Sequence, residues 1–441
     1  MVQESYRGLE WQRRNYPLLS LEEANEVLRR SEMSRNPDIQ GSVPVTRFDT
    51  LRLEATSPCQ DNYTYETAHV GTGSPWHFWG VFDGHAGHQT STVLSQALVS
   101  YVARELRQAD KADPASIDKA ITQGFVKLDD DIIRGALESV TSGETRPRAE
   151  VIADIAPAIS GSMAVLGVYD PATSALRVAS VGDSQAVLGV YKGPSPDGDP
   201  SRPTWMAAPL STPQTPDRPD ELASIHDKHP GEPDADLFTP DGRRLLGLPV
   251  TRAFGDHRWK WPEDAVTAAH KKYYAPPGRP NAKTPPYLSA EPEIATATVK
   301  AGDFAILATD GLWDTLSPDI AVQCLQMWCH DGRLNGPREH QGTAQDQEPE
   351  SVESVPVFPA RDDEAPTRVG SAWEWRARPE DLVVQDDNAA THLARNALGG
   401  KRREQFCTIL GVLDPHKDDA HDDTTVQVLF FGDRESHRVQ N

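Results

Sequence analysis

Short apolar runs typical of β-strands recur along almost the whole chain, and several are separated by turns of only a few residues. The turns DPATS (170–174) and GDS (182–184) are far shorter than the crossover of about a dozen residues that joins parallel strands. Neighbouring strands are therefore predicted to run antiparallel. The strand-like runs are His77–Phe82, Ser162–Tyr169, Ala175–Val181, Gln185–Tyr191, Phe304–Thr309 and Thr425–Phe431.

Segments with helical periodicity alternate with these runs. Apolar residues repeat at helical spacing over 93–102 and 117–132, which predicts two long amphipathic helices. Ser20 and Glu23 have the spacing of a capping box, so a short helix is predicted within 20–33. Further helices are predicted over Pro318–Asp331, with Ser317 as N-cap, and over Asn388–Leu398. The chain is thus predicted to be an α+β protein whose antiparallel sheets are covered by helices.

Proline marks stretches that interrupt this pattern. Eleven of the 36 prolines lie between Gly193 and Gly242, and a second cluster spans 276–292, so neither stretch is regular helix or central strand throughout. A third stretch, about 332–379, is polar and is predicted to be a mobile surface insertion. Because the strands are spread over the whole chain, we expect one large domain with insertions rather than three domains.

The expected organisation has three parts. Residues 1–45 form an N-terminal extension with a short helix, and 434–441 form a polar tail. Residues 46–433 form a single domain, with insertions near 193–242, 262–288 and 332–381.

Composition excludes several classes of protein. The 441 residues include 44 Lys and Arg against 66 Asp and Glu, and the net charge of −22 disfavours nucleic acid and other polyanionic partners. No apolar run approaches the ~18 residues that a membrane helix needs. The four cysteines contain no CxxC pair, which favours a reducing compartment over a disulfide scaffold. Residues 1–16 lack the apolar segment of a secretory signal and make a poor transit peptide.

Aspartates occupy the ends of several predicted strands. One such residue is usually only part of a turn, but here the pattern recurs. Several monodentate carboxylates without a His or Cys cluster suit Mg²⁺ or Mn²⁺, and bound ions would offset their mutual repulsion. The segments are WGVFDGHAG (Asp83), VASVGDSQ (Asp183), FAILATDGLWD (Asp310, Asp314) and AHDDTTVQVLFF (Asp422, Asp423), with Asp61 in SPCQDNY as a fifth candidate.

His85 lies two residues after Asp83, and its unperturbed pKa near ~6.5 makes it the candidate for proton transfer. Cys59 lies close to Asp61, but a reactive thiolate needs basic surroundings and these are acidic. We therefore assign no chemistry to Cys59.

Taken in order, FDGHAG, SGSMA, GDSQA, LPVTRAFGD, ATDGLWD and DDTTV resemble the metal-dependent type 2C protein phosphatases over about 61–431. Within that family, the segments LLSLEEANEVLRRSE, RLLGLPVTRAFGDHRWKW, TPPYLSAEPEI and QDDNAATHLARNALGG most resemble the catalytic subunits of mitochondrial pyruvate dehydrogenase phosphatases. The resemblance implies two antiparallel sheets packed face to face with helices outside, an αββα sandwich.

The resemblance also implies roles for individual residues. Asp83 would bridge two Mg²⁺ or Mn²⁺ ions, and the Gly84 carbonyl would join one of them, partly through water. Asp310 and Asp422 would complete this pair, and Asp61 would contact it. A third, weaker ion would be held by Asp183 and Asp314 together with Asp310. Asp423 stands where the family often has Asn.

The implied reaction is hydrolysis of phosphoserine or phosphothreonine in a phosphoprotein. A water shared by the two ions attacks phosphorus in line, and His85 protonates the leaving alkoxide. His85 and Asp83 are thus the expected catalytic residues. The implied partner is the pyruvate dehydrogenase complex and the implied location is the mitochondrial matrix. The cytoplasm is the alternative, because 1–16 shows no transit signal.

Three further positions depart from the family pattern. Thr56 stands where many members have a phosphate-binding Arg, Gln60 replaces an acidic residue, and Gln185 replaces an Arg. We hypothesise that Arg47 or Arg52 takes over phosphate binding.

These departures leave two alternatives open. The chain could be a general type 2C phosphatase with another substrate, or a catalytically weak relative that acts as a binding or regulatory module. A two-metal nuclease is disfavoured by the net charge of −22 and the lack of a basic stripe.

Overall fold

The computed structural model describes residues 19–37, 39, 41–71, 73–143, 146–194, 203–335, 375–412 and 417–432. The polar tail 434–441, the segment 1–16 and most of the insertion 332–381 lie outside the described residues.

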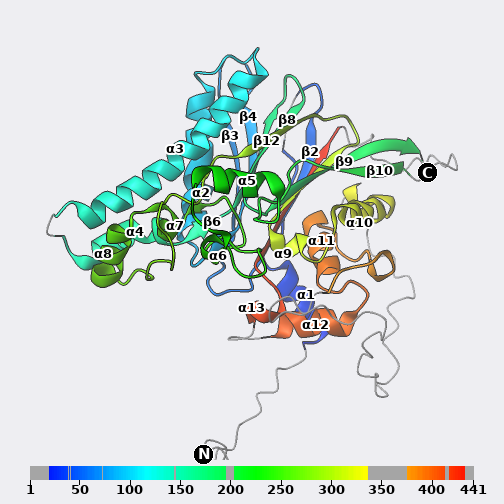
Figure 1. Cartoon of the computed structure of the whole chain (residues 1–441). Coiled ribbons are helices and arrows are strands. Elements are labelled where there is room, and N and C mark those ends of the chain that lie inside the picture. Colours follow the sequence, from blue (N-terminus) through cyan, green and yellow to red (C-terminus); the bar gives the residue numbers. More distant parts are fainter. Residues whose placement is uncertain are drawn as a thin grey trace, which may run out of the picture.

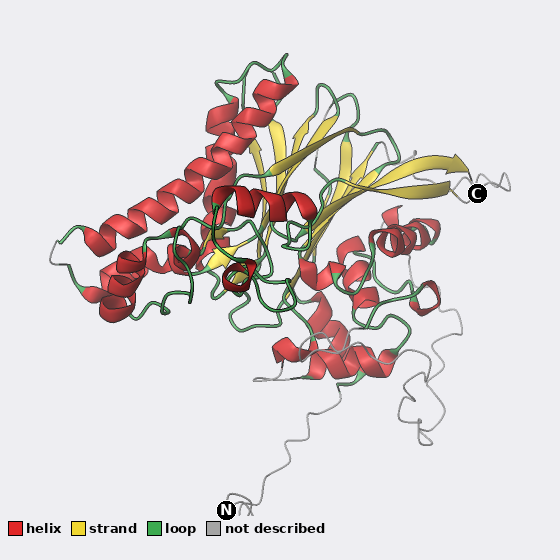
Figure 2. Cartoon of the chain, viewed as in Figure 1, coloured by secondary structure: helices red, strands yellow, loops and turns green. Residues whose placement is uncertain are grey.

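Two antiparallel sheets form the centre of the molecule, and helices lie on the outer face of each (Figures 1 and 2). This arrangement confirms the predicted sandwich. The first sheet has the order β1 (Met33–Arg35), β2 (Val45–Leu53), β14 (Thr424–Phe431), β13 (Phe304–Ala308), β9 (Gln185–Pro194) and β10 (Pro203–Pro209). The second has the order β12 (Glu293–Thr298), β8 (Ala175–Val181), β7 (Ala164–Asp170), β4 (Trp76–Phe82) and β3 (Asn62–Ala68). A third, small sheet joins β11 (Phe254–Gly255), β6 (Gly161–Ser162) and β5 (Gly84–His85).

The central strands are buried on both faces. In β13, Ala305 and Leu307 belong to the layer between the sheets, whereas Phe304 and Ile306 pack against the outer helices. A strand covered on both sides needs apolar residues at every position. For this reason its sequence is a continuous apolar run and not an alternating one.

Two long helices, α2 (Gln89–Leu106) and α3 (Pro114–Thr141), cover the five-stranded sheet and confirm the predicted pair. Leu98 of α2 and Phe125 of α3 share a core cluster with Phe78 of β4. The same side of the molecule carries α4 (Arg148–Ile159), α7 (His257–Lys260) and α8 (Glu263–Tyr273) (Figure 1).

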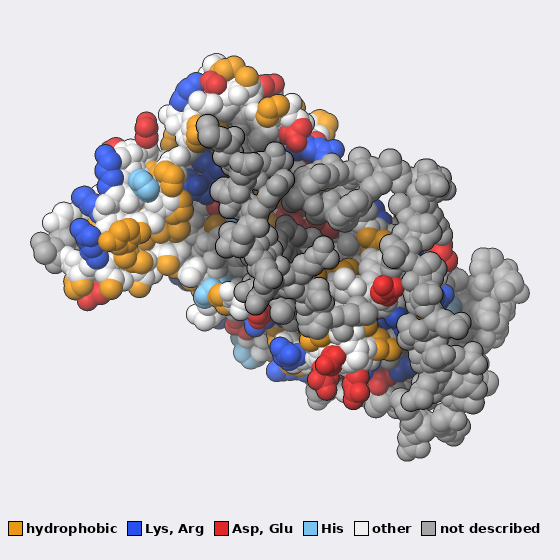
Figure 3. Space-filling view, turned by 90° about the horizontal axis from the view of Figure 1, so that it is seen from below, with side chains coloured by type: hydrophobic (Ala, Val, Ile, Leu, Met, Phe, Trp, Pro, Cys, Tyr) orange, Lys and Arg blue, Asp and Glu red, His pale blue; other side chains and the backbone are white. Residues whose placement is uncertain are grey.

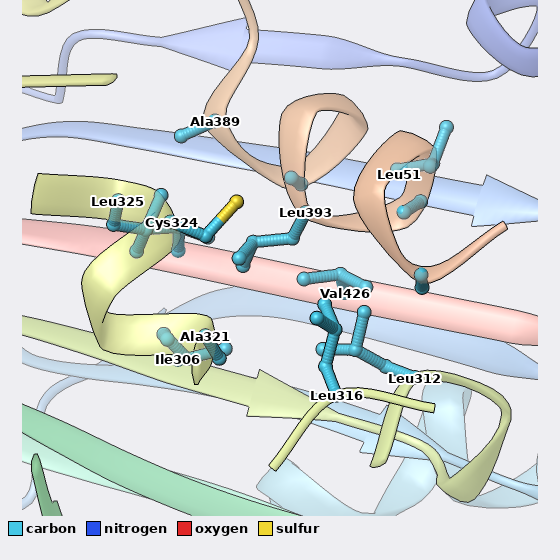
Figure 4. Close-up of a cluster of buried hydrophobic side chains, with 14 of the residues drawn as sticks. Leu51, Ile306, Leu312, Leu316, Ala321, Cys324, Leu325, Ala389, Leu393 and Val426 are labelled. Atoms are coloured by element: carbon cyan, nitrogen blue, oxygen red, sulfur yellow. The ribbon is translucent and has the colours of Figure 1, made fainter. Parts of the chain in front are cut away.

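Shorter helices cover the six-stranded sheet. Figure 4 shows Leu393 of α11 (Ala389–Ala397) and Leu316, which follows α9 (Asp310–Trp313), packed against Val426 of β14. No helix within the described ranges is both long and apolar enough to cross a membrane. The helices of this layer include α1 (Leu21–Arg29), α9 (Asp310–Trp313), α10 (Pro318–His330), α11 (Ala389–Ala397) and α12 (Arg403–Gly411).

The predicted helix near the start of the chain begins with a complete capping box. The Ser20 hydroxyl accepts a hydrogen bond from the Glu23 backbone N–H (3.2 Å), and the Glu23 carboxylate accepts one from the Ser20 N–H (2.8 Å). Ala24 and Leu28 are buried in the outer core, and β1 follows and extends the six-stranded sheet. The helix and strand within 1–45 are thus packed on the domain that follows them.

The proline-rich stretches contain short elements between loops. β10 has Pro203 and Pro209 at its two ends and is the edge strand of its sheet, where a missing N–H is tolerated. The remaining elements are α5 (Pro219–Lys228), α6 (Asp234–Leu237), α13 (Lys417–Ala420) and two 3₁₀ turns, η1 (Arg333–Asn335) and η2 (Pro379–Asp381).

Charged side chains of both signs are interspersed where the described surface is visible from below (Figure 3).

Candidate metal centre

Three aspartates from three strand ends meet at one end of the sandwich. Asp83 directly follows β4, Asp183 lies two residues after β8, and Asp310 begins α9 just beyond β13. One carboxylate oxygen of each lies within 4.8 Å of one from each of the other two. Because both sheets contribute, the packing of the sandwich itself fixes the separation of these groups. The structure thus brings these three candidates from the sequence together.

Two members of the trio each have an oxygen without the partner that buried carboxylates normally have. Asp83 Oδ2 and Asp183 Oδ1 are buried without a hydrogen-bond partner among the described residues. Burial, and then repulsion from Asp310 and other acids, raises the pKa of Asp83 well above its usual value. Burial raises the pKa of Asp183 to about 6. Burial, and then repulsion from Asp183, also raises the pKa of Asp310. A bound cation would satisfy these oxygens, and a set made only of carboxylates suits a hard divalent ion.

Asp61 is fully buried. Its Oδ2 accepts a hydrogen bond from the Thr309 hydroxyl (2.9 Å), while its Oδ1 is buried without a partner among the described residues. Burial and repulsion from Asp423 raise the pKa of Asp61 to about 8. Asp61 also raises the pKa of Asp83, which places it in the same electrostatic cluster.

Asp314 and Asp422 are exposed and lie at the edge of this cluster. Both raise the pKa of Asp183 and of Asp310. They therefore act electrostatically on the same cluster, although they are not part of the close trio.

Asp423 is buried and hydrogen-bonded to a loop, unlike its exposed neighbour Asp422. Its carboxylate accepts hydrogen bonds from the backbone N–H groups of Ala55 (2.6 Å), Thr56 (2.9 Å) and Gln60 (2.7 Å), and from the Thr56 hydroxyl. These donors occupy both oxygens, so Asp423 anchors the loop 55–60 that leads into Asp61. The sequence pattern grouped Asp423 with the other acids, but the structure gives it this separate task.

The two departures Thr56 and Gln60 belong to the same loop. The Thr56 hydroxyl is held by Asp423, and Gln60 Oε1 accepts a hydrogen bond from the Gly87 N–H (2.6 Å). A Cβ at Gly84 would lie 2.2 Å from the Gln60 carbonyl oxygen, so glycine is needed for this close approach. Both residues therefore shape the loop and place no cation beside the aspartates.

His85 is paired with an acid that sequence reasoning missed. Its Nε2 lies 2.8 Å from Asp256 Oδ2, and its Nδ1 is buried without a partner among the described residues. Burial lowers the pKa of His85, but the Asp256 carboxylate outweighs burial and the net shift is upward. The only signal in the sequence was that Asp256 closes the segment LPVTRAFGD.

A buried ion pair fixes the segment around Asp256. Lys260 Nζ donates to Asp129 Oδ2 on α3 (2.6 Å) and to the Ala253 carbonyl (2.7 Å). Asp129 Oδ1 accepts from the Gly255 N–H (2.9 Å). The backbone on both sides of Asp256 is thus tied to α3.

The structure corrects one of the two phosphate-binding hypotheses. The Arg47 guanidinium is buried, paired with Asp49 (2.8 Å), and donates to the Asp387 carbonyl (2.6 Å). Its donors are therefore engaged within the fold. Arg52 donates to the Asp61 backbone carbonyl (3.3 Å) and to the Asn62 side chain (3.3 Å), so it lies beside the segment that carries Asp61.

A second acidic group, Asp220, Glu221 and Glu293, is neutralised within the protein. Arg252 pairs with Glu221 (2.5 Å), and Arg218 pairs with Glu293 and Asp220. We assign no metal to this group.

All four cysteines are free and buried, as expected of packing residues.

Comparison with known proteins gives the family. The sequence model of Protein phosphatase 2C matches residues 45–346. A protein phosphatase 2C homolog of Schizosaccharomyces pombe is 35% identical over 88% of this chain and 81% of its own length. Mitochondrial pyruvate dehydrogenase phosphatase 1 of Saccharomyces cerevisiae is 33% identical over 88% of this chain and 69% of its own length. Human mitochondrial pyruvate dehydrogenase phosphatase 2 is 27% identical over 94% of this chain and 83% of its own length.

Among solved structures, the serine-threonine phosphatase 2C of Toxoplasma gondii covers 90% of this chain and 99% of its own, at 17% identity and a TM-score of 0.47. The family match and the 35% identical relative establish that the chain belongs to the protein phosphatase 2C family and is a serine/threonine phosphatase, a hydrolase.

Proposed function

We propose that this phosphatase uses Mg²⁺ or Mn²⁺, two ions and a third more weakly bound, to hydrolyse phosphoserine and phosphothreonine in proteins. One observation carries the proposal: three aspartates offer oxygens within 4.8 Å of one another, and two of them have a buried oxygen without a partner among the described residues. The proposed ligands are Asp61, Asp83, Asp183, Asp310, Asp314, Asp422 and the Gly84 carbonyl. When bound, the ions would supply positive charge at the phosphoryl oxygens and acidify a water.

His85 is the proposed proton donor to the leaving alkoxide. Because Asp256 engages Nε2, the proton must leave from Nδ1. The same carboxylate favours the doubly protonated ring, which is the form that has a proton at Nδ1 to give. Asp256 is thus proposed to hold His85 in both its orientation and its charge.

A turnover assay tests this proposal. The purified protein is given p-nitrophenyl phosphate and a phosphoserine peptide with Mn²⁺, and is compared with Asp83→Asn and with Asp264→Asn, an exposed residue of α8. We expect hydrolysis by the wild type and by Asp264→Asn, and its loss in Asp83→Asn. An inactive wild type would support the alternative of a catalytically weak binding module.

We further propose phosphorylated pyruvate dehydrogenase as the substrate. Two relatives that this chain matches over most of their length carry that activity in their names. The relative at 35% identity is named only as a type 2C homolog, which keeps a general phosphatase as the alternative. Rates on the phosphorylated E1 component are compared with rates on generic phosphopeptides. Equal rates would favour the general phosphatase.

The mitochondrial matrix is the proposed location, because those relatives are named as mitochondrial. A fluorescent fusion of the full native reading frame tests it, and a diffuse cytosolic signal would support the cytoplasmic alternative.

A further inference from the structure

Two arginines lie on one buried tryptophan close to the His85–Asp256 pair. The guanidinium carbons of Arg258 and Arg279 are 5.0 and 4.3 Å from the centroid of the Trp259 ring. Trp259 is 1% exposed, and its indole N–H donates to the Leu245 carbonyl (3.1 Å). The ring is therefore fixed, and it positions both guanidinium groups.

Neither guanidinium has a hydrogen bond or an ion pair within the described ranges, and Arg279 Nε is buried without a partner there. Burial lowers the pKa of Arg258, and burial together with repulsion from Arg258 lowers the pKa of Arg279. Two partly desolvated cations that repel each other are costly unless an anion joins them.

The acid that acts on both arginines is shared with His85. Asp256 raises the pKa of Arg258 and of Arg279, but its Oδ2 is bonded to His85. Elsewhere in the described fold, buried guanidinium groups have carboxylate partners, as Arg47 has Asp49 and Arg395 has Asp386. The pair formed by Arg258 and Arg279 lacks one.

The pair also lies next to the proposed reaction. Arg258 lowers the pKa of His85, so it is within electrostatic reach of the proton donor. Asp256 and Arg258 are two residues apart on the segment that Lys260 and Asp129 tie to α3. A Cβ at Gly247 would lie 3.1 Å from Arg279 Nη1, so the glycine leaves room for that group.

We propose that Arg258 and Arg279 form an oxyanion-binding site beside His85 that binds a negatively charged group of the phosphoprotein substrate. The proposal rests on the proposed phosphatase function. Guanidinium groups suit this task because their planar donors match phosphate and carboxylate oxygens. Two sources share this chemistry: the reacting phosphoryl group, and an acidic side chain next to the phosphorylated residue. The loop 55–60, whose Thr56 and Gln60 are engaged within the fold, offers no competing cation.

The test replaces both arginines by methionine, which keeps an unbranched side chain on Trp259. Arg243→Met, at an exposed position near Gly247, is the matched control. The kcat and KM are measured with p-nitrophenyl phosphate, with an acidic phosphoserine peptide, and with the same peptide after its acids are replaced by amides. We expect KM to rise about 10-fold or more for at least one substrate, since charge-assisted hydrogen bonds are worth about that factor.

The pattern of KM changes over the three substrates identifies the source of the oxyanion. A rise for all three substrates assigns the site to the phosphoryl group, and a rise for the acidic peptide alone assigns it to a flanking carboxylate. Values within twofold of the Arg243→Met control for all three would overturn the proposal.

A binding measurement separates this proposal from the proposed function. Inorganic phosphate and a glutamate-rich peptide are titrated into the Mn²⁺-loaded protein by calorimetry, with no turnover needed. Weaker binding of either one to the double variant supports the site even if the wild type hydrolyses nothing. Unchanged binding of both overturns it. If the methionine double variant does not fold, a variant with lysine at positions 258 and 279 replaces it. We expect the lysine variant to keep part of the wild-type affinity.

Discussion

Asp83 and Asp386 are both buried carboxylates, yet their surroundings drive them in opposite directions. Burial raises the pKa of Asp83, and the neighbouring acids raise it further. Burial also opposes ionisation of Asp386, but its oxygens accept hydrogen bonds from Arg395 (2.5 and 2.8 Å) and Arg29 (3.0 and 2.7 Å). These two cations outweigh burial, and the pKa of Asp386 is lowered.

The comparison shows that burial does not decide the charge of a carboxylate; its partners do. The fold supplies cations to Asp386, whereas Asp83 and Asp183 each have a buried oxygen without a partner among the described residues. A bound external cation would stabilise such acids.

The largest effect is expected from breaking the Asp386 pair. Arg395→Met leaves Asp386 buried with one cation fewer, and loss of one partner of a buried pair costs about 3–5 kcal/mol of unfolding free energy. Urea denaturation measures this loss of unfolding free energy. Arg134→Met, which breaks a pair whose side chains are 67% and 54% exposed, is the control. There we expect a change below about 1 kcal/mol.

The second prediction concerns Asp310→Asn. Removing one charge from the trio relieves repulsion, so the metal-free protein should unfold at a higher temperature than the wild type. With Mn²⁺ the same variant should lose activity by more than the roughly 10–100-fold that removing an outer-shell partner costs. Thermal melts in EDTA and turnover in Mn²⁺ give the two readouts. A lower melting temperature in EDTA would show that the repulsion is not significant.

The third prediction is a pH dependence of the metal-free protein. The folded pKa values of Asp183 (about 6) and Asp61 (about 8) lie above the ordinary value of 3.8. For groups with raised pKa, the unfolded chain releases its protons first, so stability present below the ordinary value is lost as pH rises through about 6 to 8. Asp386 contributes with the opposite sign, at acidic pH, because its folded pKa is lowered.

Melting temperatures in EDTA and in Mn²⁺ between about pH 5 and 8 check this prediction. We expect a decline with pH in EDTA and a weaker one in Mn²⁺, since the ions bind the ionised carboxylates. Parallel curves in both buffers would contradict the assignment of these acids to a metal site.

The smallest effect is expected at Asp113, an exposed acid at the start of α3. Its carboxylate accepts hydrogen bonds from the backbone N–H groups of Ala115 (3.1 Å) and Ser116 (3.2 Å). Asp113→Ala should cost about 1 kcal/mol of unfolding free energy by urea denaturation, while Asp113→Asn, which can still accept these bonds, should be nearly neutral. A large loss in Asp113→Asn would mean that charge matters there more than geometry.

The sequence predicted the fold best where strands are buried on both faces, because such strands are unmistakably apolar. It missed β2, β3 and β12, which mix polar and apolar residues. In β2, charged residues stay inside because Arg47 pairs with Asp49, and no local pattern reports such a pairing. Strands with one exposed face, such as those at the edge of a sheet, give a weaker signal in the sequence than the turns beside them.

The acids of the candidate site could be located from the sequence, but their contacts could not. Each strand end with an Asp marks itself locally, so Asp83, Asp183 and Asp310 could be found one by one. Asp256 could not, because it meets His85 across 171 positions of sequence. The different task of Asp423 was also hidden, since it depends on three backbone N–H groups of a loop far away in the chain.

The position of β14 has a consequence for how the protein is made. β14 is an interior strand between β2 and β13, and its Thr424 lies opposite Leu53 of β2. Arg29 of α1 meets Asp386 across 357 positions. During synthesis, β2 must therefore wait until residues 424–431 have left the ribosome before it can pair with β14. Such long-range pairing is slow and exposes sheet edges in the interval, so nascent chains of this protein are expected to depend on chaperones.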